Sequence, residues 1–249
     1  MRWPYPKLLA HRGGGRLAPE NTLAGMRQAK ALGFKAVEFD VKLSADGVAM
    51  LMHDDTLERT TNGVGVFRDK SAADLAMLDA GAWKGANFVG EPIPRLHDVM
   101  SYLNAQHMLA NIEIKPCLGR EGETGRIVAK LARQLAIGTY IPLISSFSVA
   151  ALTAAAETAP DLPRALLVER FDLSVLDVAL RLGCVSVNCP WRDINRPMLS
   201  QLHVEGLRVM AFTINDPAVA ESLLTLSLDG LFTDALDDMA VTFPTLRAG

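Results

Sequence analysis

Short apolar runs alternate with amphipathic segments along most of the chain. The runs are nearly continuous in aliphatic residues, which is typical of strands buried on both faces of a sheet. Eight such strands are predicted, at residues 7–10, 36–41, 109–114, 143–147, 164–168, 184–188, 207–212 and 230–233. The amphipathic segments carry the apolar spacing and the start and stop signals of helices. These helices are predicted at residues 21–32, 95–105, 122–136, 150–158, 173–182, 197–204 and 217–226.

This alternation predicts an α/β protein, and specifically a (β/α)8 TIM barrel, because about 250 residues hold eight strands with a helix between each strand and the next. A doubly wound open sheet is the alternative. Between residues 54 and 94 the rhythm breaks, and turn-forming residues prevail. We interpret this segment as a small insertion after the second strand, with short helices and a preceding extended run at 48–52. Residues 1–249 are expected to form a single domain.

Composition narrows the class of protein further. Apolar residues make up 49% of the chain and charged residues 21%, which excludes a disordered chain. The net charge is −3 and no run of Lys or Arg occurs, so we expect no nucleic-acid partner. Three cysteines without a CxxC pair indicate reduced thiols. No signal peptide or membrane span is recognisable, so a cytoplasmic protein without stable membrane association is predicted.

Polar residues gather where the first strands end. This set comprises His11 and Arg12 after the first strand, Glu38 and Asp40 in the second, His53 after the extended run, and Glu113 and Lys115 at the third. In a TIM barrel the carboxyl ends of the strands form one mouth, where the chemistry of such enzymes takes place. We therefore expect these seven side chains to converge.

The three carboxylates of this set need positive charge. Glu38 and Asp40 are two residues apart on a strand and so share a face, as do Glu113 and Lys115. Either the carboxylates share a proton or a cation lies between them, and oxygen ligands favour Mg²⁺ or Ca²⁺. Internal salt bridges to Arg12 or Lys115 are the alternative.

Two histidines beside a carboxylate cluster can divide proton transfer between them. His11 and His53 are therefore candidates for a general acid and a general base. Three further histidines are interpreted as structural or exposed, namely His97, His107 and His203. The glycines at 13–15 allow either a tight turn or a close approach of the backbone to a phosphate.

These residues occur in motifs that resemble those of glycerophosphodiester phosphodiesterases, especially the short cytosolic bacterial form. The motifs are His11-Arg12-Gly13-Gly14, Pro19-Glu20-Asn21-Thr22, Glu38-Phe39-Asp40, Asp46-Gly47, His53-Asp54, Arg59-Thr60-Thr61, Glu113-Ile114-Lys115, Phe212-Thr213-Ile214-Asn215 and Asp229-Gly230-Leu231-Phe232-Thr233-Asp234. The resemblance extends over nearly the whole chain, and the order and spacing of the first motifs are specific.

The resemblance implies a metal-dependent phosphodiesterase with a TIM barrel and an insertion after the second strand. It implies one divalent cation, Mg²⁺ or Ca²⁺, on Glu38, Asp40 and Glu113. It also implies His11 and His53 as the acid–base pair, with Arg12 and Lys115 on the substrate phosphate. The implied reaction is hydrolysis of small glycerophosphodiesters, such as glycerophosphocholine or glycerophosphoethanolamine, to sn-glycerol 3-phosphate and an alcohol, by a monomer or homodimer.

One departure concerns the pocket wall, because the family often has Trp where this chain has Phe212. Trp191 in the loop 188–195 is a second candidate for that wall, where it could contact the leaving alcohol, or it simply packs. A barrel phospholipase acting on membrane lipid, a non-catalytic phosphate-binding barrel and a barrel isomerase are alternative functions. The isomerase leaves both histidines without a role, and the binding barrel has no need of the complete set of polar residues.

Overall fold

Nine strands form one sheet that closes on itself in the computed structural model, which describes residues 3–247. Eight of them run parallel, and β1 pairs with both β2 and β9, so the barrel is closed. The parallel strands are β1 Leu8–Ala10, β2 Ala36–Leu43, β4 Leu109–Ile114, β5 Leu143–Ser146, β6 Arg164–Leu167, β7 Ser186–Pro190, β8 Arg208–Phe212 and β9 Gly230–Thr233. The predicted (β/α)8 barrel is confirmed, and the doubly wound sheet is excluded.

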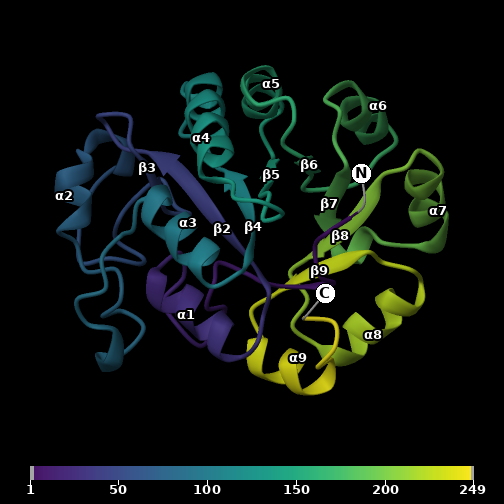
Figure 1. Cartoon of the computed structure of the whole chain (residues 1–249), viewed down its shortest axis with the longest axis horizontal. Coiled ribbons are helices and arrows are strands. Elements are labelled where there is room, and N and C mark those ends of the chain that lie inside the picture. The colour runs from purple at the N-terminus through teal and green to yellow at the C-terminus, as the bar shows by residue number, and fades with distance from the viewer. Residues whose placement is uncertain (1–2, 248–249) are drawn as a thin grey trace.

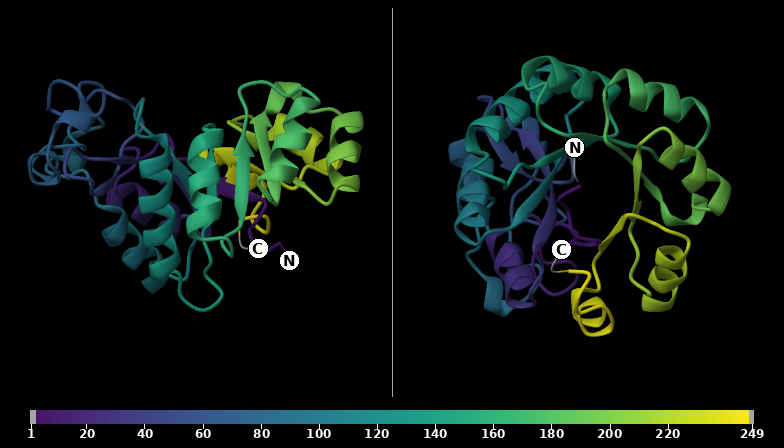
Figure 2. Two further views of the ribbon diagram at one scale, coloured as in Figure 1. Left: turned by 90° about the horizontal axis from the view of Figure 1, so that it is seen from above. Right: turned by 45° about the vertical axis from the view of Figure 1, so that its right-hand side comes forward.

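Helices surround the barrel (Figures 1 and 2). They are α1 Leu23–Ala31, α3 Leu96–Ala105, α4 Glu121–Leu135, α5 Val149–Thr158, α6 Ser174–Arg181, α7 Arg196–Val204, α8 Pro217–Thr225 and α9 Leu236–Thr242. Several begin at a side-chain cap, as where Thr22 accepts from the Gly25 N–H and Ser148 from the Ala151 N–H. The sequence patterns predict all of these helices except α9. Among residues 3–247, no helix is long and apolar enough to cross a membrane.

The extended run before the insertion becomes a ninth strand, β3 Ala49–Leu51. It pairs antiparallel with the end of β2, with Val41 opposite Leu51. The segment after it holds the short α-helix α2 Ala72–Ala76, whose cap Ser71 accepts from the Asp74 N–H, and two short 3-10 helices, Phe67–Asp69 and Ala86–Phe88. This segment lies at one side of the barrel (Figure 1) and has a small apolar core of its own, built around Met50, Leu57, Phe67, Leu75 and Ile93.

The inward side chains of the strands form layers across the barrel, because the strand register places them at matching heights. At the amino-terminal end the interior is apolar, with residues including Leu9, Leu143, Met210 and Phe232. Further along the strands the inward positions become polar. Glu38 lies beside Asn111, and Asp40 beside Glu113, because β2 and β4 pair in parallel at those residues. A hydrophobic floor therefore supports a polar mouth at the carboxyl ends.

The turn after β1 is fastened to both neighbouring strands. The His11 N–H donates to the Thr233 carbonyl at 2.9 Å, and the Gly13 N–H donates to the Glu38 carbonyl at 3.0 Å. Gly15 has φ +51°, and a Cβ built on it would lie 2.4 Å from the Asp234 carbonyl oxygen. Only glycine allows this close approach between the turn and the segment after β9.

We predict that Gly15→Ala destabilises the protein more than Gly47→Ala. Both glycines have a positive φ, but among the described residues no atom lies within 4 Å of a Cβ built on Gly47. Gly47→Ala should therefore cost only the strained backbone, about 1–3 kcal/mol, whereas Gly15→Ala adds a clash with backbone. Urea unfolding of both variants measures the difference, and equal losses would show that the turn moves without cost.

Candidate active site

A cavity of about 680 Å³ opens at the carboxyl ends of the barrel strands. Six of the seven polar residues predicted for the site line it, namely His11, Arg12, Glu38, His53, Glu113 and Lys115. The seventh, Asp40, is 1% exposed and lies among them, between Arg12 and Lys115. The fold therefore brings the whole predicted set together, as expected for the functional end of a TIM barrel.

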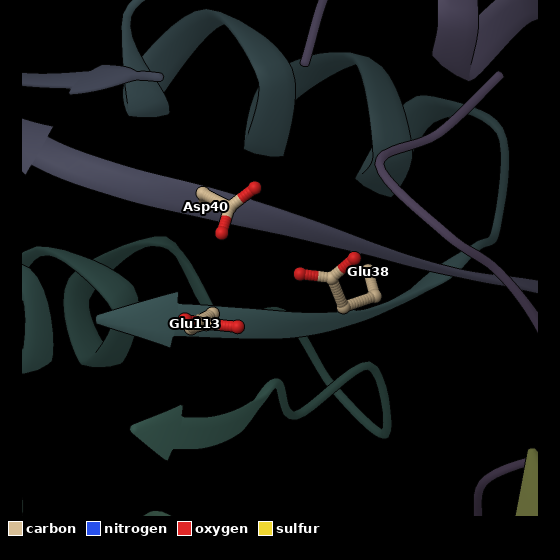
Figure 3. A group of neighbouring side chains, drawn as sticks. All are labelled: Glu38, Asp40 and Glu113. Atoms are coloured by element: carbon tan, nitrogen blue, oxygen red, sulfur yellow. The ribbon is translucent and has the colours of Figure 1, made fainter. Parts of the chain in front are cut away.

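Three carboxylates form the centre of the site (Figure 3). Glu38 and Asp40 project from one face of β2, and Glu113 projects from the neighbouring strand β4. One oxygen from each lies within 4.8 Å of the others. Such a group of hard oxygen donors can hold a divalent cation. Oε1 of Glu38 is buried without a hydrogen-bond partner among the described residues, so this atom is available to a cation.

Mutual repulsion and burial give the three carboxylates different proton affinities. Burial and the nearby charge of Asp40 raise the pKa of Glu38 to about 8 and that of Glu113 to about 7. Burial acts on Asp40 in the same direction, but Arg12 and Lys115 outweigh it and hold the pKa of Asp40 below its usual value. Without a cation, one carboxylate of the three is therefore fully ionised near neutral pH.

Two cations flank Asp40 in this arrangement. Nε of Arg12 lies 3.4 Å from Oδ2 of Asp40, and Nζ of Lys115 lies 3.7 Å from Oδ1. Lys115 also donates to Oε1 of Glu113 at 3.1 Å. The salt bridges considered from the sequence thus form at Asp40 and Glu113. Among residues 3–247, the Glu38 carboxylate accepts only the backbone N–H of Arg12, at 3.0 Å, so it keeps most of its bonding capacity.

Arg12 and Asp40 are themselves held by polar partners. Nη1 of Arg12 donates to Glu20 at 2.8 Å, and Glu20 accepts two further bonds from Arg59. The Asn21 amide donates to Oδ2 of Asp40 at 2.9 Å and accepts from the Asp40 N–H at 3.0 Å. These contacts fix the direction of Arg12 toward the cavity, and they give roles to residues that the sequence shows only as motif members.

His11 is oriented by a carboxylate from the far end of the chain. Its Nδ1 donates to Oδ1 of Asp234 at 2.7 Å, and its Nε2 lies 3.8 Å from Oε2 of Glu38. Burial lowers the pKa of His11, but the bond to Asp234 and the charge of Glu38 outweigh burial, so its pKa is raised. In the sequence Asp234 stands only as the last residue of a motif, because nothing local marks it as the partner of a residue 223 positions away.

His53 has a different environment. Its Nδ1 donates to Oδ1 of Asp54 at 2.6 Å, and Asp54 is also bound by Arg59. Burial lowers the pKa of His53, and the charges of Arg12 and Lys115 lower it further, so that it lies below its usual value despite Asp40 and Asp54. The two imidazoles therefore favour opposite protonation states at the same pH.

An aromatic pair forms one wall of the cavity. Phe212 and Phe147 pack edge to face with ring centroids 5.8 Å apart, and both line the cavity. Nζ of Lys115 lies 5.8 Å from the centroid of the Phe147 ring. The structure places Phe212, the candidate for the pocket wall, beside this cavity together with Phe147, which the sequence does not single out.

Other sequence candidates lie outside this cavity. Trp191 is not among the described residues that line it, because its ring packs partly buried against the barrel core under the guanidinium of Arg192, which lies 4.4 Å away. His97 and His107 are exposed, and His203 pairs with a carboxylate elsewhere. The expected structural or exposed positions of these three histidines agree with the structure.

Comparisons with known proteins point to one family. The sequence model of the glycerophosphoryl diester phosphodiesterase family matches residues 11–238. A glycerophosphodiester phosphodiesterase from Caldanaerobacter subterraneus subsp. tengcongensis is 30% identical over 227 residues, which cover 91% of this chain and 93% of that protein.

Solved structures agree with this similarity. An Oleispira antarctica phosphodiesterase, solved in complex with the product sn-glycerol-3-phosphate, is 34% identical with a TM-score of 0.93, covering 97% of this chain and 98% of its own. A glycerophosphodiester phosphodiesterase from Agrobacterium tumefaciens is 30% identical with a TM-score of 0.81, covering 95% of this chain and 99% of its own.

Cation affinity should rise with pH. Carboxylates must lose their protons to bind a metal, and the pKa is about 8 for Glu38 and about 7 for Glu113 in the cation-free site. We therefore expect the affinity for Mg²⁺ or Ca²⁺ to increase between about pH 6 and about pH 8.5 and then to level off. Calorimetry in two buffers of different ionisation enthalpy measures both the affinity and the protons released.

Glu113→Gln serves as the matched variant for this experiment. It keeps the size of the side chain but removes one ligand charge, so it should weaken binding and reduce the number of protons released. If the affinity of Glu113→Gln equalled that of the unaltered protein at every pH, Glu113 would not be a ligand.

Proposed function

The chain belongs to the glycerophosphoryl diester phosphodiesterase family and is a phosphoric diester hydrolase, and we propose that it hydrolyses small glycerophosphodiesters to sn-glycerol 3-phosphate and an alcohol. One observation carries this proposal. Two histidines, each with its own carboxylate partner, face the same cavity as three carboxylates, Arg12 and Lys115. An isomerase that used Glu38 or Glu113 as its base would leave both imidazoles and both cationic side chains without a role.

Charge balance explains how the site would accept an anionic substrate. A phosphodiester carries one negative charge, which the three carboxylates alone would repel. Arg12 and Lys115 offset two of these charges, and we propose that one divalent cation, Mg²⁺ or Ca²⁺, lies on Glu38, Asp40 and Glu113. When bound, such a cation supplies positive charge to the transition state and acidifies the attacking hydroxyl. Arg12 and Lys115 would then bind the non-bridging phosphate oxygens.

The opposite pKa shifts of the two imidazoles suggest their roles. His53, whose pKa is lowered, would accept the proton of the nucleophile, which is either water or the glycerol hydroxyl of the substrate. The nucleophile's oxygen forms a bond to phosphorus as the bond to the departing alcohol breaks. Attack by water gives sn-glycerol 3-phosphate directly, whereas attack by the glycerol hydroxyl would give a cyclic phosphate that water opens in a second step. His11, whose pKa is raised and whose Nδ1 is held by Asp234, would donate its proton to that alcohol. The Phe147–Phe212 wall would contact the apolar carbons of the substrate.

The cellular setting is proposed on chemical grounds. All three cysteines are buried and unpaired, which suits a reducing compartment, so we propose that the protein acts in the cytoplasm. A small diester needs no nucleic-acid or stable membrane partner, and one chain holds every group of the proposed mechanism. Both a monomer and a homodimer are compatible with this site.

The proposed reaction is tested by release of glycerol 3-phosphate. We expect release from glycerophosphocholine and glycerophosphoethanolamine in the presence of Mg²⁺ or Ca²⁺, and its loss with EDTA, because the site then lacks the positive charge that stabilises the transition state and acidifies the attacking hydroxyl. Restoring an excess of the cation should restore the rate. Folded protein that releases no glycerol 3-phosphate with either cation would contradict the proposed substrates, and release that EDTA does not reduce would contradict the cation.

Removing either imidazole should slow the chemical step. His11→Ala and His53→Ala are each expected to lower kcat by about 10²–10⁴-fold, the usual contribution of a general acid or base. His97→Ala is the control, because His97 is exposed and lies outside the cavity. Circular dichroism would verify folding. A variant at 11 or 53 that kept the unaltered kcat would remove that histidine from the mechanism.

A further inference from the structure

A buried amide lies below the three carboxylates. Asn111 is on β4, two residues before Glu113, so both side chains point to the same face of the strand. The parallel register places Asn111 directly beside Glu38 of β2. Asn111 is only 1% exposed, yet it lines the active-site cavity. Its side chain therefore forms part of the floor on which the carboxylate cluster sits.

The nitrogen and the oxygen of this amide differ in their hydrogen bonding. Nδ2 of Asn111 donates to the hydroxyl of Ser145 on β5 at 2.9 Å. Oδ1 is buried and has no hydrogen-bond partner among residues 3–247. A buried polar atom without a partner costs about 1–3 kcal/mol, and native proteins leave few of them. The bond to Ser145 holds the amide plane, so the free oxygen keeps a fixed direction.

Glu38, the neighbour of Asn111 across the two strands, also has a buried oxygen without a hydrogen bond in the part of the chain that the structure describes. Oε1 of Glu38 is also buried without a partner among the described residues. An amide oxygen and an ionised carboxylate oxygen both accept, so neither satisfies the other. Two adjacent acceptors in a cavity that also holds Asp40 and Glu113 call for a positive group between them. A hard divalent cation, which takes six or more oxygen ligands, is such a group.

We propose that Asn111 is a positioning residue of the cation site and that its Oδ1 faces the cation, as a direct ligand or through one of its water molecules. The proposal rests on the proposed function, in which Glu38, Asp40 and Glu113 hold the cation. A neutral oxygen suits this position, because a fourth carboxylate would add to the repulsion among the existing three. The amide adds a donor atom and leaves the net charge of the site unchanged.

The barrel supplies a matched control for this amide. Asn188 on β7 is fully buried and also has one unpartnered side-chain atom among the described residues. That atom is Nδ2, a donor, and Asn188 is not among the described residues lining the cavity. A purely structural loss of a buried amide should affect both residues alike. Only Asn111 presents an acceptor oxygen to the cation site.

The experiment measures the affinity of Mg²⁺ and Ca²⁺ by calorimetry, together with thermal unfolding of the cation-free proteins. Asn111→Ala is expected to weaken cation binding by about 10–100-fold, the usual effect of losing a group that supports a metal site. Asn111→Leu keeps nearly the volume of the side chain without the oxygen, and it should show the same loss. Asn111→Asp keeps an oxygen at this position and should bind the cations more tightly than Asn111→Ala and Asn111→Leu, although its charge adds to the repulsion among the three carboxylates; a loss as large as that of Asn111→Ala would contradict the role of the oxygen. Asn188→Ala should bind with unaltered affinity.

The outcomes separate this inference from the proposed function. If folded Asn111→Ala and Asn111→Leu bound the cations with the unaltered affinity while Glu113→Gln did not, the role of Asn111 would be refuted and the carboxylate site would stand. If Asn188→Ala weakened binding as much as Asn111→Ala, the effect would belong to barrel packing, and the inference would fail. If the unaltered protein bound neither cation, the cation of the proposed function would fail together with the role of Asn111.

Discussion

Three carboxylates buried within 4.8 Å of one another cannot all be ionised unless positive charge lies beside or between them. The barrel supplies part of that charge from its own residues, because Arg12 and Lys115 flank Asp40. Glu38 and Glu113 remain with raised pKa values, so in the cation-free protein they tend to keep protons. The site therefore lacks positive charge beside Glu38 and Glu113, and a divalent cation would supply it.

Much of the surrounding structure holds the compensating charges in position. Arg12 adopts a left-handed backbone conformation, with φ +49°, which directs its N–H at Glu38. Glu20, itself bound by Arg59, then holds the guanidinium of Arg12. Asn21 also has a left-handed backbone conformation, and its side-chain amide donates to the Asp40 carboxylate and accepts from the Asp40 N–H. Strained conformations of this kind persist where neighbouring contacts determine them. The turn after β1 is thus shaped by the carboxylates it must face.

Sequence patterns were sufficient for the parts of this arrangement that depend on local order. Continuous apolar runs predict the barrel strands, and a residue's place at a strand end predicts that it reaches the mouth. Partners that come from distant strands leave no such mark, which is why the sequence places Asp234 in a motif but does not predict the hydrogen bond by which it orients His11. Helix α9 was not predicted, because its seven residues are too few to show a helical repeat of apolar positions. Trp191 illustrates the converse, since a loop aromatic packs against the core as readily as it lines a cavity.

The charges around the three carboxylates also affect the protonation of His11 and His53. Each has a carboxylate on its Nδ1, so a carboxylate partner by itself does not distinguish them. The difference arises from what else they face. Burial lowers the pKa of both imidazoles. At His53 the charges of Arg12 and Lys115, the cations that Asp40 requires, lower it further, whereas at His11 the bond to Asp234 and the charge of Glu38 outweigh burial and Arg12. Positive charge placed to relieve the carboxylates therefore also disfavours a proton on His53 and leaves His11 as the imidazole that retains one. Carboxylate repulsion and the direction of proton transfer are in this way two consequences of one charge arrangement.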